Sequence, residues 1–214
     1  MRTALGQDVA GIAAGLDNRA IHVWLLNYQR SQRRGPLCAL VGAYLGIPAA
    51  EVAFREGEHG RPELVSPWRD ALQFNWSHSG EKAIIAVARD VVPGIDIERL
   101  RPRPRVMALA DRFFHPAEAA ALEVLDNTQR EEAFLRLWTC KEAVLKALGR
   151  GLAFGLERLH VTLEHGSAAL CWVDGDDASS WQLHMLDVGS DYGASLAWRG
   201  PPRTIAIWTL ADSS

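Results

Sequence analysis

The chain has 214 residues, of which 48% are hydrophobic and 23% are charged, a composition typical of a globular protein with one large or two small domains. Its 23 basic and 26 acidic residues give a net charge of −3, so composition does not favour a nucleic-acid partner. No apolar run approaches the roughly 18 residues of a membrane span. The three cysteines show no paired spacing and the N-terminus is a poor signal peptide, so we expect a cytoplasmic protein with reduced thiols.

The first hundred residues predict strands and one helix. Pro36 and Gly46 bracket an apolar segment, as expected where a helix begins and ends. Runs of β-forming residues predict strands, and the last two of these are expected to pair as a hairpin. The predicted helix covers residues 36–46, and the predicted strands cover residues 21–26, 51–56, 82–89 and 94–100. The segment FNWSHSG, residues 74–80, is expected to form a turn.

Residues 99–105, RLRPRPR, break this pattern with two prolines and alternating arginines, and we interpret them as a linker. The strongest helical signal follows at residues 129–149, where apolar residues form one stripe and Gly149 marks the end. The second half predicts helices at residues 106–114, 117–125 and 129–149, and strands at residues 156–164, 169–173, 181–186, 193–198 and 203–210.

The order of these elements repeats within the chain. Residues 83–98 overlay residues 193–208 as a strand, a turn with proline and a second strand, and the helix before each copy also recurs. The overlay is one of pattern rather than of identity. It predicts an α+β fold, a pseudodimer of two similar halves covering residues 1–100 and 101–214.

The two copies differ in one respect that bears on function. The first copy carries Asp96 and Glu98 where the second has apolar residues, which predicts one site rather than two. Residues i and i+2 of a strand face the same side, so these carboxylates lie next to each other and repel. A divalent cation would relieve the repulsion, and oxygen-only ligands suit Mg²⁺. The alternative is an edge strand with one face in water.

The predicted helix at residues 129–149 carries three charged residues next to its apolar stripe. Glu142 and Lys146 are four residues apart and share a face, which indicates either the edge of a cleft or a surface ion pair. Lys141 falls inside the apolar stripe, where a lysine is costly unless its amine reaches water or a partner. Either snorkelling or a functional role explains it.

Two further segments offer groups that can hold an anion. The predicted turn contains Ser77, His78 and Ser79, which can bind phosphate oxygens; a structural or exposed histidine is the alternative. Arg61 lies beside a turn, and a group of arginines that ends at Arg34 precedes a helix, where the dipole disfavours cations. An anion would explain that placement, as would a solvated face.

The combination of these segments is more specific than any one of them. The sequence contains FNxSHS, GIDIE, FFxxxE and WTxKEAxxKxxGxG in this order. In this it resembles the 4′-phosphopantetheinyl transferase family, of the long, monomeric type, from about Val23 to Leu163. The resemblance implies a pseudodimer of two α+β halves with the active site between them. It also implies transfer of phosphopantetheine from coenzyme A to a serine of an acyl or peptidyl carrier protein, with adenosine 3′,5′-bisphosphate as the other product.

The resemblance also implies roles for individual residues. Asp96, Glu98 and Glu142 would hold Mg²⁺ against the coenzyme A diphosphate. Glu142 would also be the base for the carrier serine, with Glu118 of the FFHPAE segment as the alternative base. Lys146 would neutralise the phosphate. Phosphoryl transfer depends on such charge neutralisation and positioning more than on covalent chemistry.

The remaining implied contacts are to coenzyme A. His78, Arg61 and Arg34 would hold its phosphates and its adenosine end, and Lys141, which lies within the helical motif, would touch the site. The stretch at residues 27–35 is shorter than is usual in the family, which leaves few basic residues for the 3′-phosphate.

The sequence also bears on the partner protein and on competing functions. Arginines alternate through the linker at positions 99, 101, 103 and 105 and would steer an acidic carrier protein; a solvated linker is the alternative. We expect a monomer without nucleic-acid or membrane partners. The competing functions are a non-catalytic descendant that binds coenzyme A or a carrier protein, and an unrelated Mg²⁺-dependent nucleotide hydrolase.

Overall fold

The computed structural model describes residues 2–4, 8–57, 59–164 and 166–211. The N-terminal part contains the helices α1 (Val9–Ala14) and α2 (Gly35–Leu45), and the strands β1 (Arg2–Ala4), β2 (Ala20–Asn27), β3 (Phe54–Glu56), β4 (Pro62–Leu64), β5 (Gln73–Ser79), β6 (Lys82–Ala88) and β7 (Gly94–Arg99). The C-terminal part contains the helices α3 (Val106–Phe113), α4 (Pro116–Glu123) and α5 (Asn127–Leu148), and the strands β8 (Leu159–Glu164), β9 (Ser167–Val173), β10 (Trp181–Leu186), β11 (Tyr192–Arg199) and β12 (Thr204–Leu210).

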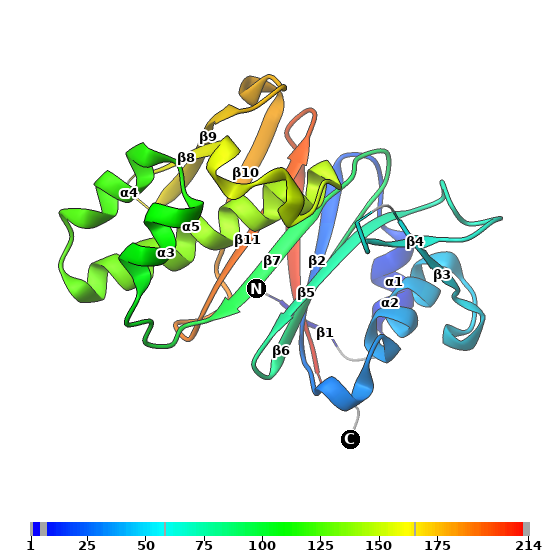
Figure 1. Ribbon diagram of the computed structural model, residues 1–214. Helices are drawn as coiled ribbons and strands as arrows, with labels where there is room; N and C mark the ends of the chain where they lie inside the picture. Colours follow the sequence, from blue (N-terminus) through cyan, green and yellow to red (C-terminus); the bar gives the residue numbers. More distant parts are fainter. Residues whose placement is uncertain (1, 5–7, 58, 165, 212–214) are drawn as a thin grey trace.

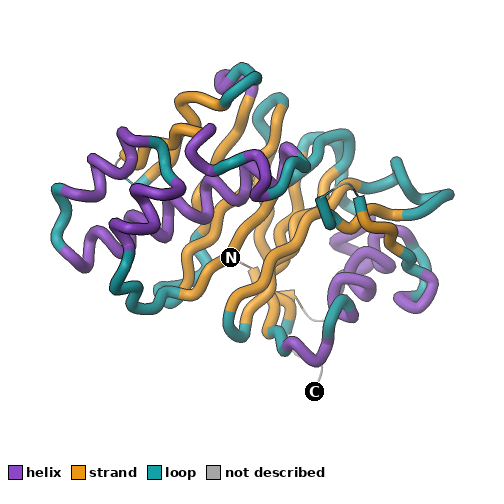
Figure 2. Tube along the Cα trace, viewed as in Figure 1, coloured by secondary structure: helices purple, strands orange, loops and turns teal. Residues whose placement is uncertain are grey.

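Two sheets form the centre of the molecule, with helices on their outer sides (Figures 1 and 2). The larger sheet has the strand order β1-β12-β2-β6-β5, and the smaller has the order β10-β11-β7. Helices α1 and α2 pack on the larger sheet, and the long helix α5 packs on the smaller one. The mixture of helices and sheets confirms the α+β prediction.

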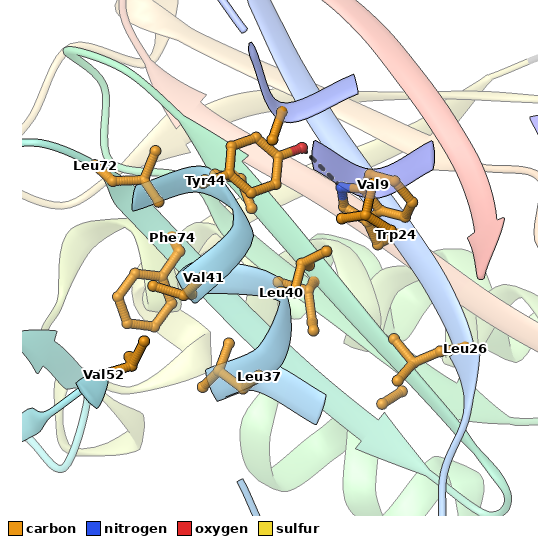
Figure 3. Packing of buried hydrophobic residues seen from close by; sticks show 14 of the residues in the cluster. Val9, Trp24, Leu26, Leu37, Leu40, Val41, Tyr44, Val52, Leu72 and Phe74 are labelled. Atoms are coloured by element: carbon orange, nitrogen blue, oxygen red, sulfur yellow. Dashed lines mark hydrogen bonds between the residues drawn. The ribbon is translucent and has the colours of Figure 1, made fainter. Parts of the chain in front are cut away.

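The core has three parts, and strand β2 contributes to two of them. Trp24 and Leu26 pack with α1 and α2 (Figure 3), whereas Val23 and Leu25 belong to a second cluster shared with β7 and β11. Because β2 is covered on both faces, its sequence shows an apolar run rather than a regular alternation. The third cluster lies under α5.

The helix ends match the signals in the sequence. Helix α2 has Pro36 in its first turn and ends at Gly46, whose φ is +70°. Helix α5 begins after Asp126, whose carboxylate accepts a hydrogen bond from the amide of Gln129, and it ends at Gly149 with a φ of +69°. Both left-handed residues are glycines because a side chain there would be strained. The predicted helices and most of the predicted strands are confirmed.

The predicted hairpin between residues 82–89 and 94–100 is wrong. Strand β6 pairs with β2 on one edge and with β5 on the other, so neither edge is left for β7. Strand β7 instead pairs antiparallel with β11 of the smaller sheet. Its counterpart in the repeat, β12, pairs parallel with β2 of the larger sheet. Each half therefore gives its last strand to the other half, and the division at residue 100 remains a prediction.

The turn predicted at residues 74–80 is also wrong, because most of this segment is strand β5, antiparallel to β6. The turn prediction rests on Ser77, His78 and Ser79, whereas in the structure the serines alternate with aromatic neighbours, as a strand with one polar face requires. The strand predicted at residues 51–56 is shorter, Phe54–Glu56. No helix among the described residues combines the length and the apolar character needed to cross a bilayer.

Candidate active site

The carboxylates of β7 lie beside the end of helix α5 because β7 begins with a glycine. A side chain on Gly94 would overlap the carbonyl oxygen of Ala143 and the amide nitrogen of Ala147, so only glycine allows this approach. Two residues later, Asp96 meets the last turns of α5. The sequence motifs GIDIE and WTCKEAVLK, about 40 residues apart along the chain, therefore form one site.

Asp96 is the most buried carboxylate of this site, with 4% of its surface exposed. Lys146 Nζ donates to Asp96 Oδ1 at 2.6 Å and to the carbonyl of Ile95 at 3.0 Å. The hydroxyl of Ser77 donates to the same Oδ1 at 2.8 Å. The other oxygen, Oδ2, is buried and has no hydrogen-bond partner in the described part of the chain. Since a buried oxygen seldom lacks a partner in a native protein, this atom points to a missing ligand.

Two more carboxylates face the same region. Glu98 Oε2 accepts a hydrogen bond from the Ser79 hydroxyl at 2.8 Å and lies 3.6 Å from Arg103 Nη2. Burial raises the pKa of Glu142 to about 7, helped by the negative charges of Asp96 and Glu98 and opposed by Lys146. A carboxyl group with a pKa near neutrality is suited to accept a proton in catalysis.

The chemistry of these side chains fits a hard divalent cation. They are oxygen donors, which Mg²⁺ prefers, and the buried, unpartnered Oδ2 of Asp96 would be completed by such an ion. Among the residues that the structure describes, no group of three or more Asp, Glu, His or Cys side chains is gathered closely enough to hold a metal ion. The donors are therefore close, but they do not form a finished coordination shell.

Lys141 and Glu118 are found in a different place. Lys141 Nζ lies 2.7 Å from Glu118 Oε2 and also donates to the carbonyls of Leu156 and Leu159. Glu118 Oε1 accepts from the amide of Val161 at 2.7 Å. Both side chains are buried, with exposures of 0% for Lys141 and 1% for Glu118. Burial lowers the pKa of Lys141, and the Glu118 carboxylate opposes that shift.

This burial bears on two roles that the resemblance implied. A carrier serine cannot reach a carboxylate that is closed inside the core, and Lys141 has its polar contacts on the α4 and β8 side of helix α5. The structure does not bring Glu118 and Lys141 to the Asp96 cluster. We interpret them as a buried structural pair.

Arg61 is bound to the backbone at the junction of the two halves. Its guanidinium donates to the carbonyl of Lys146 at 3.1 Å and to that of Phe74 at 2.8 Å, with Pro93 O at 3.5 Å. Burial lowers the pKa of Arg61. The side chain thus ties the end of α5 to β5 and to the turn before β7. It borders a cavity of about 390 Å³ whose lining includes His59.

His78 lies on the opposite side of β5 from the serines. It packs against Tyr28 and Trp76, with ring centroids 4.8 Å and 5.3 Å away. Burial and the positive charges of Arg30 and Lys146 lower the pKa of His78, while Glu98 opposes them. Arg30 and Lys146 therefore act on His78 electrostatically.

Arg34 is placed less favourably than the sequence implied. It is the N-cap residue of α2 and lies 3.6 Å from Glu56, and the two side chains are 40% and 73% exposed. Arg30, rather than Arg34, is the arginine of this segment that influences His78.

Sequence reasoning missed the serines of β5 and Arg103 as neighbours of the carboxylates. The sequence predicts that Ser77 and Ser79 can bind phosphate from a turn, whereas in the structure they donate to Asp96 and Glu98. Their spacing of two residues was the signal, because it places both on one face of a strand. Nothing local in the sequence indicates the Arg103–Glu98 pair.

The chain is similar to known proteins over the segments that carry these residues. A sequence profile of the 4′-phosphopantetheinyl transferase superfamily matches residues 93–197, which include β7 and α5. The chain is 42% identical over 168 residues to the 4′-phosphopantetheinyl transferase HetI of Nostoc sp., covering 78% of this chain and 69% of HetI. It is 33% identical over 133 residues to the 4′-phosphopantetheinyl transferase of Bacillus subtilis, covering 62% of this chain and 57% of that protein. The structure of holo-[acyl-carrier-protein] synthase from Thermotoga maritima superposes with a TM-score of 0.42 and 21% identity, over 51% of this chain and 64% of that one.

Proposed function

This chain belongs to the 4′-phosphopantetheinyl transferase superfamily, and we propose that it transfers 4′-phosphopantetheine from coenzyme A to a serine of an apo acyl or peptidyl carrier protein in a Mg²⁺-dependent reaction. The observation that carries the proposal is the cluster at the junction of β7 and α5. There Lys146 holds one oxygen of Asp96 and leaves the other buried without a partner.

The reaction is a phosphoryl transfer, for which the site needs to neutralise charge and align the reactants. Asp96, Glu98 and Glu142 would hold Mg²⁺, which supplies charge neutralisation at the diphosphate of coenzyme A when it is bound. Lys146, whose side chain is 26% exposed, adds a positive charge from the protein.

Glu142 is our candidate for the base. Its pKa of about 7 allows it to be ionised at neutral pH and to accept the proton of the carrier serine. The serine oxygen then bonds to the phosphorus next to the pantetheine, and the bond from that phosphorus to the bridging oxygen breaks. Adenosine 3′,5′-bisphosphate leaves with the bond's electrons. The buried Lys141–Glu118 pair argues against Glu118 in this role.

The nucleotide end of coenzyme A has two candidate contact regions. The cavity beside Arg61 is lined by His59, Arg69 and Phe74, and also by the acidic residues Glu63 and Asp70. The second region is that of His78, on which Arg30 and Lys146 act electrostatically. We propose that these groups compensate for the short segment at residues 27–35.

The carrier protein is proposed to approach along the linker. Arg101 and Arg105 are exposed. A cavity of about 420 Å³ lies between the linker and the start of α5, and its charged lining residues are Arg101, Arg103, Glu131, Glu132 and Asp191. The basic residues would attract an acidic carrier surface and bring its serine toward Glu98 and Glu142. We propose that the protein acts as a monomer.

Intact mass spectrometry tests the proposal. The protein is incubated with coenzyme A, Mg²⁺ and several apo carrier proteins, each of which is then weighed. Addition of one phosphopantetheinyl group, abolished by EDTA, is the expected result, and it also ranks the carriers. If coenzyme A binds but no carrier gains mass, the protein is a non-catalytic binder. If phosphopantetheine or phosphate is released without a carrier, it is a hydrolase.

A further inference from the structure

Strands β5 and β7 run side by side where the two sheets meet (Figure 1). In the described part of the chain, β5 shares its backbone ladder with β6, and β7 shares its ladder with β11. The contact between them is made instead by side chains from alternate residues of β5: Asn75, Ser77 and Ser79. Asn75 Oδ1 accepts a hydrogen bond from the amide of Ile95 at 3.1 Å and so anchors the backbone of β7.

Ser77 contributes to the site in a different way from Asn75. Its hydroxyl donates to Oδ1 of Asp96 at 2.8 Å, the same oxygen that accepts from Lys146 at 2.6 Å. A hydroxyl and a cation therefore hold one oxygen of this carboxylate. The second oxygen is left buried and, among the described residues, without a partner.

Ser79 repeats the arrangement two residues along. Its hydroxyl donates to Oε2 of Glu98 at 2.8 Å, and Arg103 approaches the same oxygen at 3.6 Å. The Ser79 oxygen also accepts from the amide of Arg99 at 3.1 Å, which fixes the direction in which the hydroxyl proton points. Again a hydroxyl and a cation meet at one carboxylate oxygen.

We infer that Ser77 and Ser79 are positioning residues, which hold Asp96 and Glu98 by one oxygen each and orient them toward a shared divalent cation. The inference rests on the proposed function. Two carboxylates two residues apart repel each other, and each would rotate away if nothing held it. Donors behind a metal-binding carboxylate fix its orientation, and their loss typically weakens metal binding about 10–100-fold. The alternating serines of β5 supply such donors from the opposite sheet.

The test compares Ser77→Ala, Ser79→Ala and the double variant with the wild type. Mn²⁺ affinity in the presence of coenzyme A is measured by electron paramagnetic resonance, alongside the Mg²⁺ concentration that gives half-maximal transfer. We expect the double variant to bind Mn²⁺ about 10-fold more weakly or worse, with an unchanged KM for the carrier. Ser79→Thr, which keeps the hydroxyl, should recover most of the affinity.

Ser167→Ala is the matched control, because Ser167 is an exposed strand residue whose hydroxyl donates to the carbonyl of Glu164 at 2.7 Å, outside the site. Its Mn²⁺ affinity should equal that of the wild type. The inference is overturned if the double variant binds Mn²⁺ as tightly as the wild type and has only a lower melting temperature, since that indicates a purely structural role. It is also overturned if the wild type binds no Mn²⁺.

The same experiment separates this inference from the proposed function. If the wild type modifies no carrier but the alanine variants still lose Mn²⁺ affinity, the transferase proposal fails and the positioning role stands. If the wild type modifies carriers and the variants keep their affinity, the positioning role alone fails.

Discussion

Helix α5 makes two lysine–carboxylate pairs, and they face different parts of the molecule. Lys141 and Glu118 are 0% and 1% exposed, and backbone groups satisfy their remaining hydrogen bonds. The side chains of Lys146 and Asp96 are 26% and 6% exposed, and Asp96 Oδ2 has no partner among the described residues. The first pair is complete within the chain. The second pair has an unpartnered acceptor on Asp96 and a partly exposed lysine.

This difference shows how a structural pair is separated from a functional one of the same chemistry. A buried ion pair whose hydrogen bonds are all made gives a ligand nothing to bind. A partly exposed pair with an unsatisfied acceptor offers a cation a free oxygen to bind and offers a phosphate an accessible lysine. Both lysines belong to one motif, WTCKEAVLK, so the residue types alone do not distinguish them. The predictions below test the distinction.

The largest effect is expected at Asp96. Asp96→Asn keeps the size of the side chain but removes the charge that Lys146 and a cation need. Transfer should fall about 1,000-fold or more, which corresponds to about 4 kcal/mol of barrier, while the melting temperature stays close to that of the wild type. Steady-state assays at saturating Mg²⁺ measure this. Asp174→Asn, in the exposed pair with Arg158, is the control, and near-normal turnover of Asp96→Asn would remove Asp96 from the site.

The buried pair should respond in the opposite manner. Glu118→Gln leaves Lys141 buried without its counter-charge, and the loss of one partner of such a pair costs about 3–5 kcal/mol of unfolding free energy. Activity per folded molecule should remain near that of the wild type. Urea denaturation with parallel activity assays measures both quantities. A double variant, Glu118→Leu with Lys141→Met, should recover part of the stability. An inactive Glu118→Gln of normal stability would make Glu118 part of the chemistry.

The sequence singled out Asp96 and Lys146 as candidate site residues, but it paired Lys146 with Glu142 and not with Asp96. Asp96 and Lys146 could be found because each lies in an element with a strong pattern, an apolar strand and a 22-residue helix. Lys141 was noticed as out of place in an apolar stripe. Its partner could not be deduced, because Glu118 comes from another helix and the contact depends on how α4 packs on α5.

Strand β5 and Arg103 show the same limit. Ser and Asn favour turns as isolated residues, yet β5 is a strand because its partner β6 pairs along its whole length. The hairpin prediction was wrong for a related reason. Strands β2 and β5 occupy both edges of β6, and this pairing depends on the whole sheet rather than on the local sequence. Arg103 meets Glu98 through a linker with no periodic signal. Tertiary contacts decided each of these cases.

The pH dependence of transfer tests Glu142. Burial and neighbouring carboxylates raise its pKa to about 7 in the metal-free protein. At limiting Mg²⁺ the ionised base is therefore lost below that pH, and kcat/KM measured there should fall about tenfold per pH unit on the acid side. In the metal-free protein the folded carboxyl holds its proton more tightly than the unfolded one. Stability should therefore fall as the pH rises from about 4.5 to about 7. Glu142→Gln should abolish this fall as well as the activity, and a wild-type profile flat from pH 5 to 8 would contradict the assignment.

The smallest effect is expected at the linker, where charge acts at a distance from the chemistry. Arg101→Ala with Arg105→Ala removes two exposed charges and leaves Arg103 in contact with Glu98. Exposed charges act mainly on encounter rates and are screened by salt, so KM for an acidic carrier should rise only a few-fold at low ionic strength, with kcat unchanged. The difference in KM between the variant and the wild type should vanish at high salt, because salt screens the attraction between the wild-type arginines and the carrier. Arg55→Ala, on β3 and away from the linker, should leave KM unaltered. If KM does not depend on salt or on these arginines, the carrier binds elsewhere, and the linker serves only to place Arg103 behind the carboxylates.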